Sequence, residues 1–226
     1  MKRDLKADLE LCKQVESDWE KVGTRPWLTP PNPKYKVIYA DPPWEYRQSG
    51  SKKMKRGMAK QHYRTMPTDE ICGLPIQSLA AEDALLFLWA TFPNISEALK
   101  VMEAWGFQYK TAAFVWVKKN RKAGTNFWGM GAYTRANAEV VLLGVSPKTK
   151  ARQVIKRHDI HQIVEAPVGR HSAKPDEVRQ RIVDLCGDVP RVELFAREKP
   201  DGWDVWGDEV ASDFVMVNRY HLKEDK

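Results

Sequence analysis

The chain is 226 residues long, 42% hydrophobic and 30% charged, with a net charge of +7, the composition of an ordinary globular protein large enough to bury its own core. It has no run of about 18 apolar residues, and its first residues, MKRDLKADLE, lack the apolar core of a secretion signal, so we expect neither membrane insertion nor export. Cys12, Cys72 and Cys186 lie too far apart for a zinc knuckle or a disulfide framework, which favours a reducing, cytoplasmic setting and no bound metal.

The first 34 residues predict a helix followed by an extended connection. Apolar side chains recur at helical spacing between Leu5 and Val22, with charged residues between them. Four prolines then fall between Thr24 and Tyr35, a density that neither a helix nor a central strand accepts. We expect this segment to lead into the main domain, and composition leaves open whether the helix docks on that domain or on a second subunit.

Short, continuously apolar runs follow at wide intervals, with candidate helices between them. Such runs predict strands covered on both faces, as in a mainly parallel sheet, and the intervals look too wide for hairpins. Strands that alternate with helices predict a doubly wound α/β fold, in which ligands bind at the carboxyl ends of the strands. The expected strands are residues 37–40, 84–90, 111–117, 140–145 and 192–196, and the expected helices are residues 68–79, 96–105 and 174–185.

Positive charge is concentrated in the middle of the chain. Residues 35–197 hold 26 Lys and Arg against 16 Asp and Glu, and 18 of those cations fall in three windows without an acid, 46–68, 104–138 and 140–158. A surface that meets a polyanion excludes acids, because each acid repels a phosphate. The windows favour a nucleic-acid partner, and the alternative is three solvated loops that happen to be basic.

The tetrapeptide Asp41-Pro42-Pro43-Trp44 stands at the expected carboxyl end of the first strand. A residue before proline is held extended, and two prolines remove two backbone donors, so the segment is stiff and rich in acceptors that nothing local satisfies. The Asp41 carboxylate, the Pro42 carbonyl and the Trp44 ring complement an exocyclic amino group on a flat ring. The alternative is a proline turn that closes a strand, with Asp41 as a cap and Trp44 in the core.

These groups suit methylation of the 6-amino group of adenine. The lone pair of that nitrogen is delocalised into the ring, and two acceptors that hold both N–H bonds favour a nitrogen with its lone pair free. Asp41 is too weak a base to deprotonate the neutral amine beforehand. We expect it to stabilise the cation that develops as the methyl group arrives.

The sequence resembles the MTA (70-kDa subunit) family of S-adenosylmethionine-dependent adenine N6-methyltransferases, whose catalytic motif the tetrapeptide looks like. Blocks at 171–177, 193–197 and 203–209 follow in the family's order. The resemblance implies a Rossmann-like methyltransferase fold, with a mainly parallel sheet flanked by helices and the catalytic motif before the cofactor motifs. It implies that Asp41, Pro42, Pro43 and Trp44 are catalytic and that S-adenosyl-L-methionine is the cofactor. By the same resemblance, the cofactor is bound by Asp41, Lys174, Glu193, Leu194, Phe195, Arg197, Asp208 and Glu209.

The resemblance also concerns one cofactor residue, a missing loop and several candidate substrate contacts. Many relatives have Asn where this chain has Asp208. The stretch VELFARE lacks the glycine-rich loop of standard methyltransferases, an absence that is itself typical of this family. Trp128 and Tyr133 offer stacking faces for unpaired bases, with core packing as the alternative. The expected substrate-binding residues are Tyr63, which resembles a tyrosine that encloses the target base, together with Lys52, Lys53, Lys55, Arg56, Arg135 and Asn137.

We therefore predict an adenine N6-methyltransferase that acts on nucleic acid, with DNA favoured over RNA. RNA remains an alternative, and so does a catalytically silent nucleic-acid-binding partner subunit. A homodimer or a heterodimer is open on sequence alone. Residues 1–34 are expected to form the N-terminal helix and connection, residues 35–210 the catalytic domain, and residues 211–226 a C-terminal tail.

Overall fold

The computed structural model describes residues 34–45, 65–131, 133–147, 151–169, 173–214 and 216. Several predictions lie outside these residues: the N-terminal helix and its proline-rich connection, most of the tail, and the basic loop that holds Tyr63, Lys52, Lys53, Lys55 and Arg56. Within the described residues, no helix is long and apolar enough to cross a membrane.

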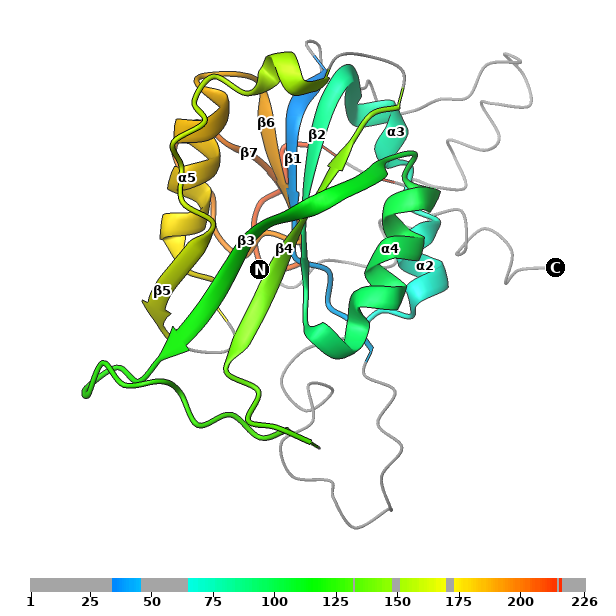
Figure 1. The fold of residues 1–226 in the computed structure, drawn as a ribbon. Coiled ribbons are helices and arrows are strands. Elements are labelled where there is room, and N and C mark those ends of the chain that lie inside the picture. Colours follow the sequence, from blue (N-terminus) through cyan, green and yellow to red (C-terminus); the bar gives the residue numbers. More distant parts are fainter. Residues whose placement is uncertain are drawn as a thin grey trace, which may run out of the picture.

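Seven strands form one sheet at the centre of the fold (Figure 1). Their order is β5-β3-β4-β2-β1-β6-β7, and the pairs β1–β2, β1–β6, β3–β5 and β6–β7 are parallel. The predicted Rossmann-like, mainly parallel sheet is confirmed. The strands are β1 (Tyr35–Ala40), β2 (Ala80–Ala90), β3 (Gln108–Lys119), β4 (Ala138–Val145), β5 (Ile163–Pro167), β6 (Arg191–Leu194) and β7 (Asp204–Trp206).

β4 runs against both of its neighbours, β2 and β3. Because β3 and β4 are consecutive, they form a wide hairpin closed by residues 120–137, and the prediction that the intervals exclude hairpins is wrong here. A strand covered on both faces has the same apolar pattern in either direction, so its sequence does not reveal the reversal. The reversal brings the first residues of β4 to the edge of the sheet at which β1, β2 and β3 end.

Sequence analysis also missed two strands and merged two helices. β5 has alternating buried and exposed residues instead of an apolar run, and β7 is only three residues long. The helix predicted over residues 68–79 is divided into α2 (Thr68–Cys72) and α3 (Ile76–Leu79). Pro75 lies at the break, where it has no N–H to continue a helical hydrogen-bond ladder.

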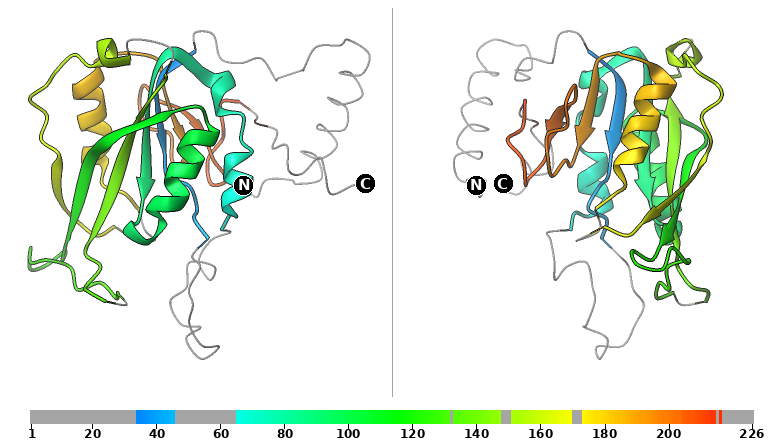
Figure 2. Two further views of the ribbon diagram at one scale, coloured as in Figure 1. Left: turned by 45° about the vertical axis from the view of Figure 1, so that its right-hand side comes forward. Right: turned by 90° about the vertical axis from the view of Figure 1, so that its left-hand side faces the viewer.

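Helices cover both faces of the sheet (Figure 2). α2, α3 and α4 (Ile95–Ala104) pack over one core, and α5 (Asp176–Cys186) packs over the other. Pro175 precedes α5, and Gly187, with φ of 75°, follows its last residue. Two short 3-10 turns, η2 (Phe92–Asn94) and η3 (Ala151–Val154), complete the elements.

Side chains of β1 alternate between these two cores. Ile38 and Ala40 belong to the core under α2 and α4, whereas Val37 and Tyr39 belong to the core under α5. The same alternation sends Asp41, the next residue, to the α5 side. The residue predicted to be catalytic therefore lies at the carboxyl edge of the sheet and on its α5 face.

Replacing a leucine in the sheet tests which residues carry the stability of this fold. Leu86 on β2 is fully buried, so Leu86→Ala is expected to lower the free energy of unfolding by about 2–5 kcal/mol. Leu99 on α4 is 36% exposed, and Leu99→Ala serves as the matched control, with a clearly smaller loss. Urea denaturation measures both, and equal losses at the two positions would contradict the assignment of the core.

Candidate active site

The segment after β1 is bound to its neighbours through its backbone. The Trp44 N–H donates to the Pro42 carbonyl at 2.8 Å, and the Met66 N–H donates to the Pro43 carbonyl at 2.8 Å. The prediction that nothing local satisfies these carbonyls is therefore wrong. A carbonyl has a second lone pair, so the Pro42 oxygen still has acceptor capacity for a ligand.

Trp44 lies in the core rather than on an open ledge. Its side chain is 5% exposed among the residues under α2 and α4, and its Nε1–H donates to the Trp89 carbonyl at 3.1 Å. This bond ties the segment after β1 to the end of β2. The role of Trp44 in stacking on a base stays a prediction, and its position in the structure is that of an anchor.

Four charged side chains form a continuous series of ion pairs at this edge. Lys174 Nζ lies 2.8 Å from Asp41 Oδ2 and 3.4 Å from Glu139 Oε2. Lys118 Nζ lies 2.5 Å from Glu139 Oε1. The side chains are only 12% to 26% exposed, so water screens these charges weakly. We call these four residues the charge chain.

The charge chain is assembled by strand alternation. Lys118 follows Trp116 by two residues on β3, Glu139 precedes Val141 by two on β4, and Trp116 and Val141 belong to the core under α5. Lys174 comes from the segment before α5 and also lies over the Trp89 ring, 5.3 Å from its centre. Residues distant in the sequence therefore meet because their strands end at one edge.

Opposite charges in the chain shift the acidities of its members. Burial lowers the pKa of Lys174, but its two carboxylate neighbours outweigh burial and hold that pKa above its ordinary value. Burial raises the pKa of Glu139, but Lys174 and Lys118 outweigh it and hold that pKa below its ordinary value. Burial raises the pKa of Asp41 above its ordinary value, against the attraction of Lys174. The pKa values of the two carboxylates are thus shifted in opposite directions.

Glu193 on β6 is a third carboxylate beside Asp41. It pairs with Arg179 of α5, whose Nη1 lies 3.2 Å from Glu193 Oε2. Burial raises the pKa of Glu193 to about 7, with Arg179 opposing the rise and Asp41 adding to it. A carboxyl group with a raised pKa suits a site that binds a cation or shares a proton.

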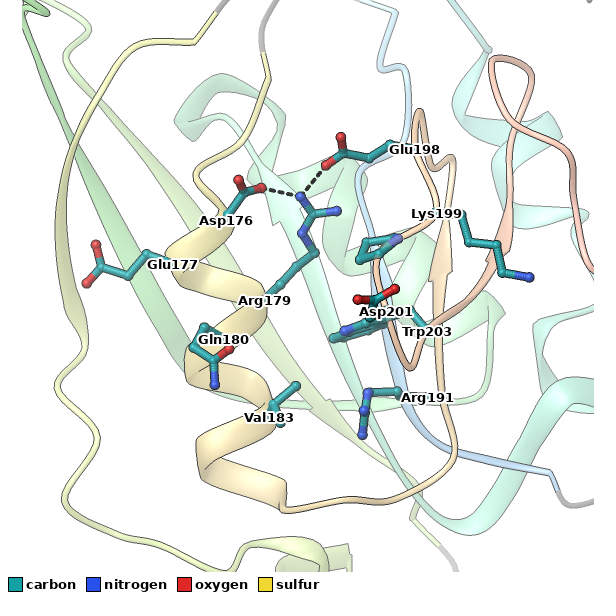
Figure 3. Close-up of a pocket in the computed structure, with 11 residues that line it drawn as sticks. Asp176, Glu177, Arg179, Gln180, Val183, Arg191, Glu198, Lys199, Asp201 and Trp203 are labelled. Atoms are coloured by element: carbon teal, nitrogen blue, oxygen red, sulfur yellow. Dashed lines mark hydrogen bonds and ion pairs between the residues drawn. The ribbon is translucent and has the colours of Figure 1, made fainter.

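An open pocket is lined in part by Arg179 (Figure 3). Its volume is about 760 Å³, and Arg179 lies between Asp176 of α5 and Glu198, with ion pairs to both. None of the charge-chain residues lines this pocket. The remaining lining residues are Glu177, Gln180, Val183, Arg191, Lys199, Pro200, Asp201 and Trp203.

The turns that follow β6 and β7 are pressed together. Phe195 has φ of 62°, a conformation uncommon for a residue with a side chain, and its ring makes an edge contact with Trp206. A Cβ added to Gly207 would lie 2.0 Å from the Ala196 carbonyl oxygen. Only glycine permits this close approach.

The cofactor residues predicted from the resemblance lie largely on these two turns. Arg197 Nε lies 3.5 Å from Glu209 Oε1, which places a cation and a carboxylate from separate blocks side by side. Leu194 is fully buried, so it offers a ligand only its backbone, and its carbonyl accepts from the Asp41 N–H at 3.5 Å. The described residues of the three blocks, 173–177, 193–197 and 203–209, therefore lie around the carboxyl ends of β1, β6 and β7.

The loop of residues 120–137 is closed on itself and exposes large side chains. Arg135 lies over the Trp128 ring, 4.6 Å from its centre, while Trp128 is 71% exposed and Tyr133 fully exposed. This contradicts the alternative that the two aromatic residues are core residues. Added Cβ atoms at Gly129 and Gly131 would meet the backbone of residues 136 and 134, so these glycines allow the loop's own two sides to approach.

Sequence reasoning missed Lys118 and gave Glu139 no role. The signal that could have found them is the position of a charge at the end of an apolar strand, two residues from a buried apolar side chain. Asn137, predicted to bind substrate, lies just before β4, and its carbonyl accepts from the Lys118 N–H at 2.8 Å. Its predicted contact with substrate stays a prediction.

Comparison with known proteins gives consistent matches. The family model MT-A70 matches residues 35–209. The chain is 34% identical over 201 residues to the Type II methyltransferase M.MunI from Mycoplasma sp, covering 83% of this chain and 82% of that protein. It is 27% identical to a probable N(6)-adenosine-methyltransferase MT-A70-like protein of Oryza sativa and 30% identical to the human N(6)-adenine-specific methyltransferase METTL4. These matches cover 89% and 78% of this chain but only 27% and 37% of the two eukaryotic proteins.

Gly207→Ala tests the contact between the two turns. The new methyl group must displace the backbone of Ala196, so we expect a loss of about 1–3 kcal/mol in the free energy of unfolding. Gly124→Ala is the control, because a Cβ there meets nothing within 4 Å and costs only the strain of its positive φ, about 1 kcal/mol. Urea denaturation of both variants separates crowding from strain, and a smaller loss at Gly207 than at Gly124 would contradict the close approach.

Proposed function

Because the chain belongs to the MT-A70 family of adenine N6-methyltransferases, we propose that it transfers the methyl group of S-adenosylmethionine to the 6-amino group of adenine in DNA. The observation that carries the proposal is the Asp41 carboxylate at the carboxyl end of β1, held by Lys174 at 2.8 Å. DNA is favoured because the chain is 34% identical to a Type II methyltransferase, whereas it is 27% identical to the rice relative, which is named for adenosine.

Asp41 acts on the amino group with one of its two oxygens. Oδ2 accepts from Lys174, so we assign Oδ1 to one N–H of the adenine amino group and the Pro42 carbonyl to the other. As the nitrogen gains its bond to carbon it becomes cationic, and the adjacent carboxylate stabilises that charge. The nitrogen then loses one proton, for which Asp41 Oδ1 is the nearest assigned acceptor.

The cofactor supplies a methyl group on a positively charged sulfur, which is a strong electrophile. The residues at the carboxyl edge fit it by their chemistry: Lys174 and Arg197 are cations for its carboxylate, and Glu193 is a partly buried carboxylate for its ammonium. Asp208 and Glu209, on the turn after β7, are acceptors for ribose hydroxyls. These residues bind and orient the cofactor so that the methyl group faces the amine.

The loop of residues 120–137 is the proposed contact for the nucleic-acid strand. It joins β3 to β4 at the carboxyl edge and projects beyond the sheet (Figure 1). Trp128 exposes a ring face, Arg135 supplies a cation beside it, and residues 104–138 contain no acid. A base on an aromatic face gains about 1–3 kcal/mol from stacking, and the loop leaves phosphates unopposed by acids.

Asp41→Asn tests the catalytic role. The amide keeps the shape of the side chain but loses the negative charge, so turnover is expected to fall by about 10²–10³-fold while the protein still binds cofactor. Asp83→Asn is the matched control, because Asp83 also pairs with a lysine, Lys36, at 2.8 Å but lies at the opposite end of the strands. It should leave turnover unchanged.

The assay is liquid chromatography of nucleosides from treated DNA and RNA, which identifies the modified atom and the polymer together. N6-methyladenine in DNA is the expected product. N6-methyladenine found only in RNA would show that RNA, not DNA, is the substrate. If neither polymer is methylated although the folded protein binds the cofactor, the function is that of a silent nucleic-acid-binding subunit.

Trp128→Ala tests the strand contact. Loss of one stacking face is expected to weaken DNA binding by about 10-fold or more, with cofactor affinity unchanged. Tyr109→Ala is the control, because Tyr109 is 45% exposed at the opposite end of β3. Fluorescence anisotropy with labelled DNA at several salt concentrations measures both variants, and equal affinities for wild type and Trp128→Ala would remove the loop from the interface.

A further inference from the structure

Lys118 has contacts that the methyl-transfer mechanism does not use. Its ammonium lies 2.5 Å from Glu139 Oε1 and 5.1 Å from the centre of the Trp116 ring, and its side chain is 17% exposed. Such a partly buried lysine is costly unless it is paired, and Glu139 is its partner. Lys118 is therefore the member of the charge chain next to the loop of residues 120–137, and Glu139 stands between it and Lys174.

Glu139 divides its two oxygens between two lysines, and the division is unequal. Oε1 is taken by Lys118 at 2.5 Å, and Oε2 lies 3.4 Å from Lys174, which is closer to Asp41 at 2.8 Å. Two ammonium groups thus balance two carboxylates. Removing Lys118 would leave one ammonium between two partly buried carboxylates, and Glu139 would compete with Asp41 for Lys174.

We propose that Lys118 is a positioning residue of the active site: by holding Glu139, it keeps Lys174 on Asp41 and thereby keeps Asp41 ionised and oriented toward the amine. This inference rests on the proposed role of Asp41 in methyl transfer. Lys118 acts through Glu139 and Lys174 and is not assigned any contact with the substrate.

Other charges around Asp41 stay constant in this comparison. Arg197 from the turn after β6 attracts it, while Glu193 on β6 repels it and Tyr39 precedes it by two residues on β1. Glu139 on β4 also repels Asp41 across Lys174. Changes at Lys118 or Glu139 therefore alter one side of the environment of Asp41 and leave the β6 side intact.

Two substitutions have opposite expected effects on Asp41. Lys118→Met leaves Glu139 and Asp41 to share one lysine, so the pKa of Asp41 is expected to rise by about one unit. Glu139→Gln removes the competing carboxylate and leaves Lys174 to Asp41 alone, so the pKa of Asp41 is expected to fall. A purely structural role for Lys118 would not produce shifts of opposite sign. Lys118→Arg restores the cation and is expected to return the pKa toward the wild-type value.

The experiment follows the carboxyl carbon of Asp41 by ¹³C NMR across pH, in full-length protein labelled at aspartate. The signal is assigned by its loss in Asp41→Asn, and circular dichroism at each pH shows that every variant is folded. Lys36→Met is the control, because it breaks a lysine–aspartate pair at the opposite edge. The inference is supported by a rise in Lys118→Met and a fall in Glu139→Gln, and it is overturned if either curve coincides with that of the wild type.

Turnover measured over the same pH range separates this inference from the proposed function. If the inference and the proposed function are both right, the pH at which turnover falls on the acidic side shifts in each variant together with the NMR midpoint of Asp41. Shifts in the NMR midpoint without any methylation by the wild type would overturn the proposed function alone. Methylation by the wild type with superimposed NMR curves would overturn the inference alone. If Lys118→Met does not fold, Glu139→Gln and Lys118→Arg decide, since a midpoint that does not fall in Glu139→Gln contradicts the proposed competition.

Discussion

The arrangement of the sheet's carboxyl edge depends on four charges that neutralise one another. They belong to two lysines and two carboxylates. A partly buried charge is stable only beside its partner, and removing one partner leaves the other in an unfavourable environment. Lys118, Glu139, Lys174 and Asp41 come from four separate segments, so their mutual pairing requires those segments to end side by side. The acid at position 41 is therefore held by the topology of the sheet as much as by its own loop.

Trp89 connects this charged edge to both cores. Its Nε1–H donates to the Tyr39 hydroxyl at 2.6 Å, its carbonyl accepts from Trp44, and its ring lies under Lys174. One fully buried residue at the end of β2 thus contacts β1, the segment after β1 and the segment before α5. Large aromatic side chains bury much area and still offer a polar group for a specific bond, which suits this connecting position.

The sequence predicted much of this architecture because its clearest signals are local. The apolar run 37–40 and the stiff tetrapeptide after it take their conformation from residues next to them in the sequence. The direction of β4 and the satisfied carbonyl of Pro42 depend on partners far along the chain.

The position of Trp44 also depends on residues that are distant in the sequence. A tryptophan after two prolines is equally consistent with a binding face and with a core position. Only the surrounding residues from α2 and α4 place it in the core. Lys118 was missed for a related reason, because a lysine at a strand end looks like an ordinary surface charge until Glu139 is placed opposite it.

The wide hairpin of β3 and β4 has a consequence for the edge of the sheet. The segment that projects from it begins directly after Lys119 and ends at residue 137, two positions before Glu139. At its base the Lys118 N–H donates to the Asn137 carbonyl, and the Phe127 N–H donates to the Lys118 carbonyl. Both members of one ion pair therefore stand at the two ends of a single exposed segment. The side chains that lie next to Lys174 and the outermost part of the hairpin belong to one continuous stretch of chain.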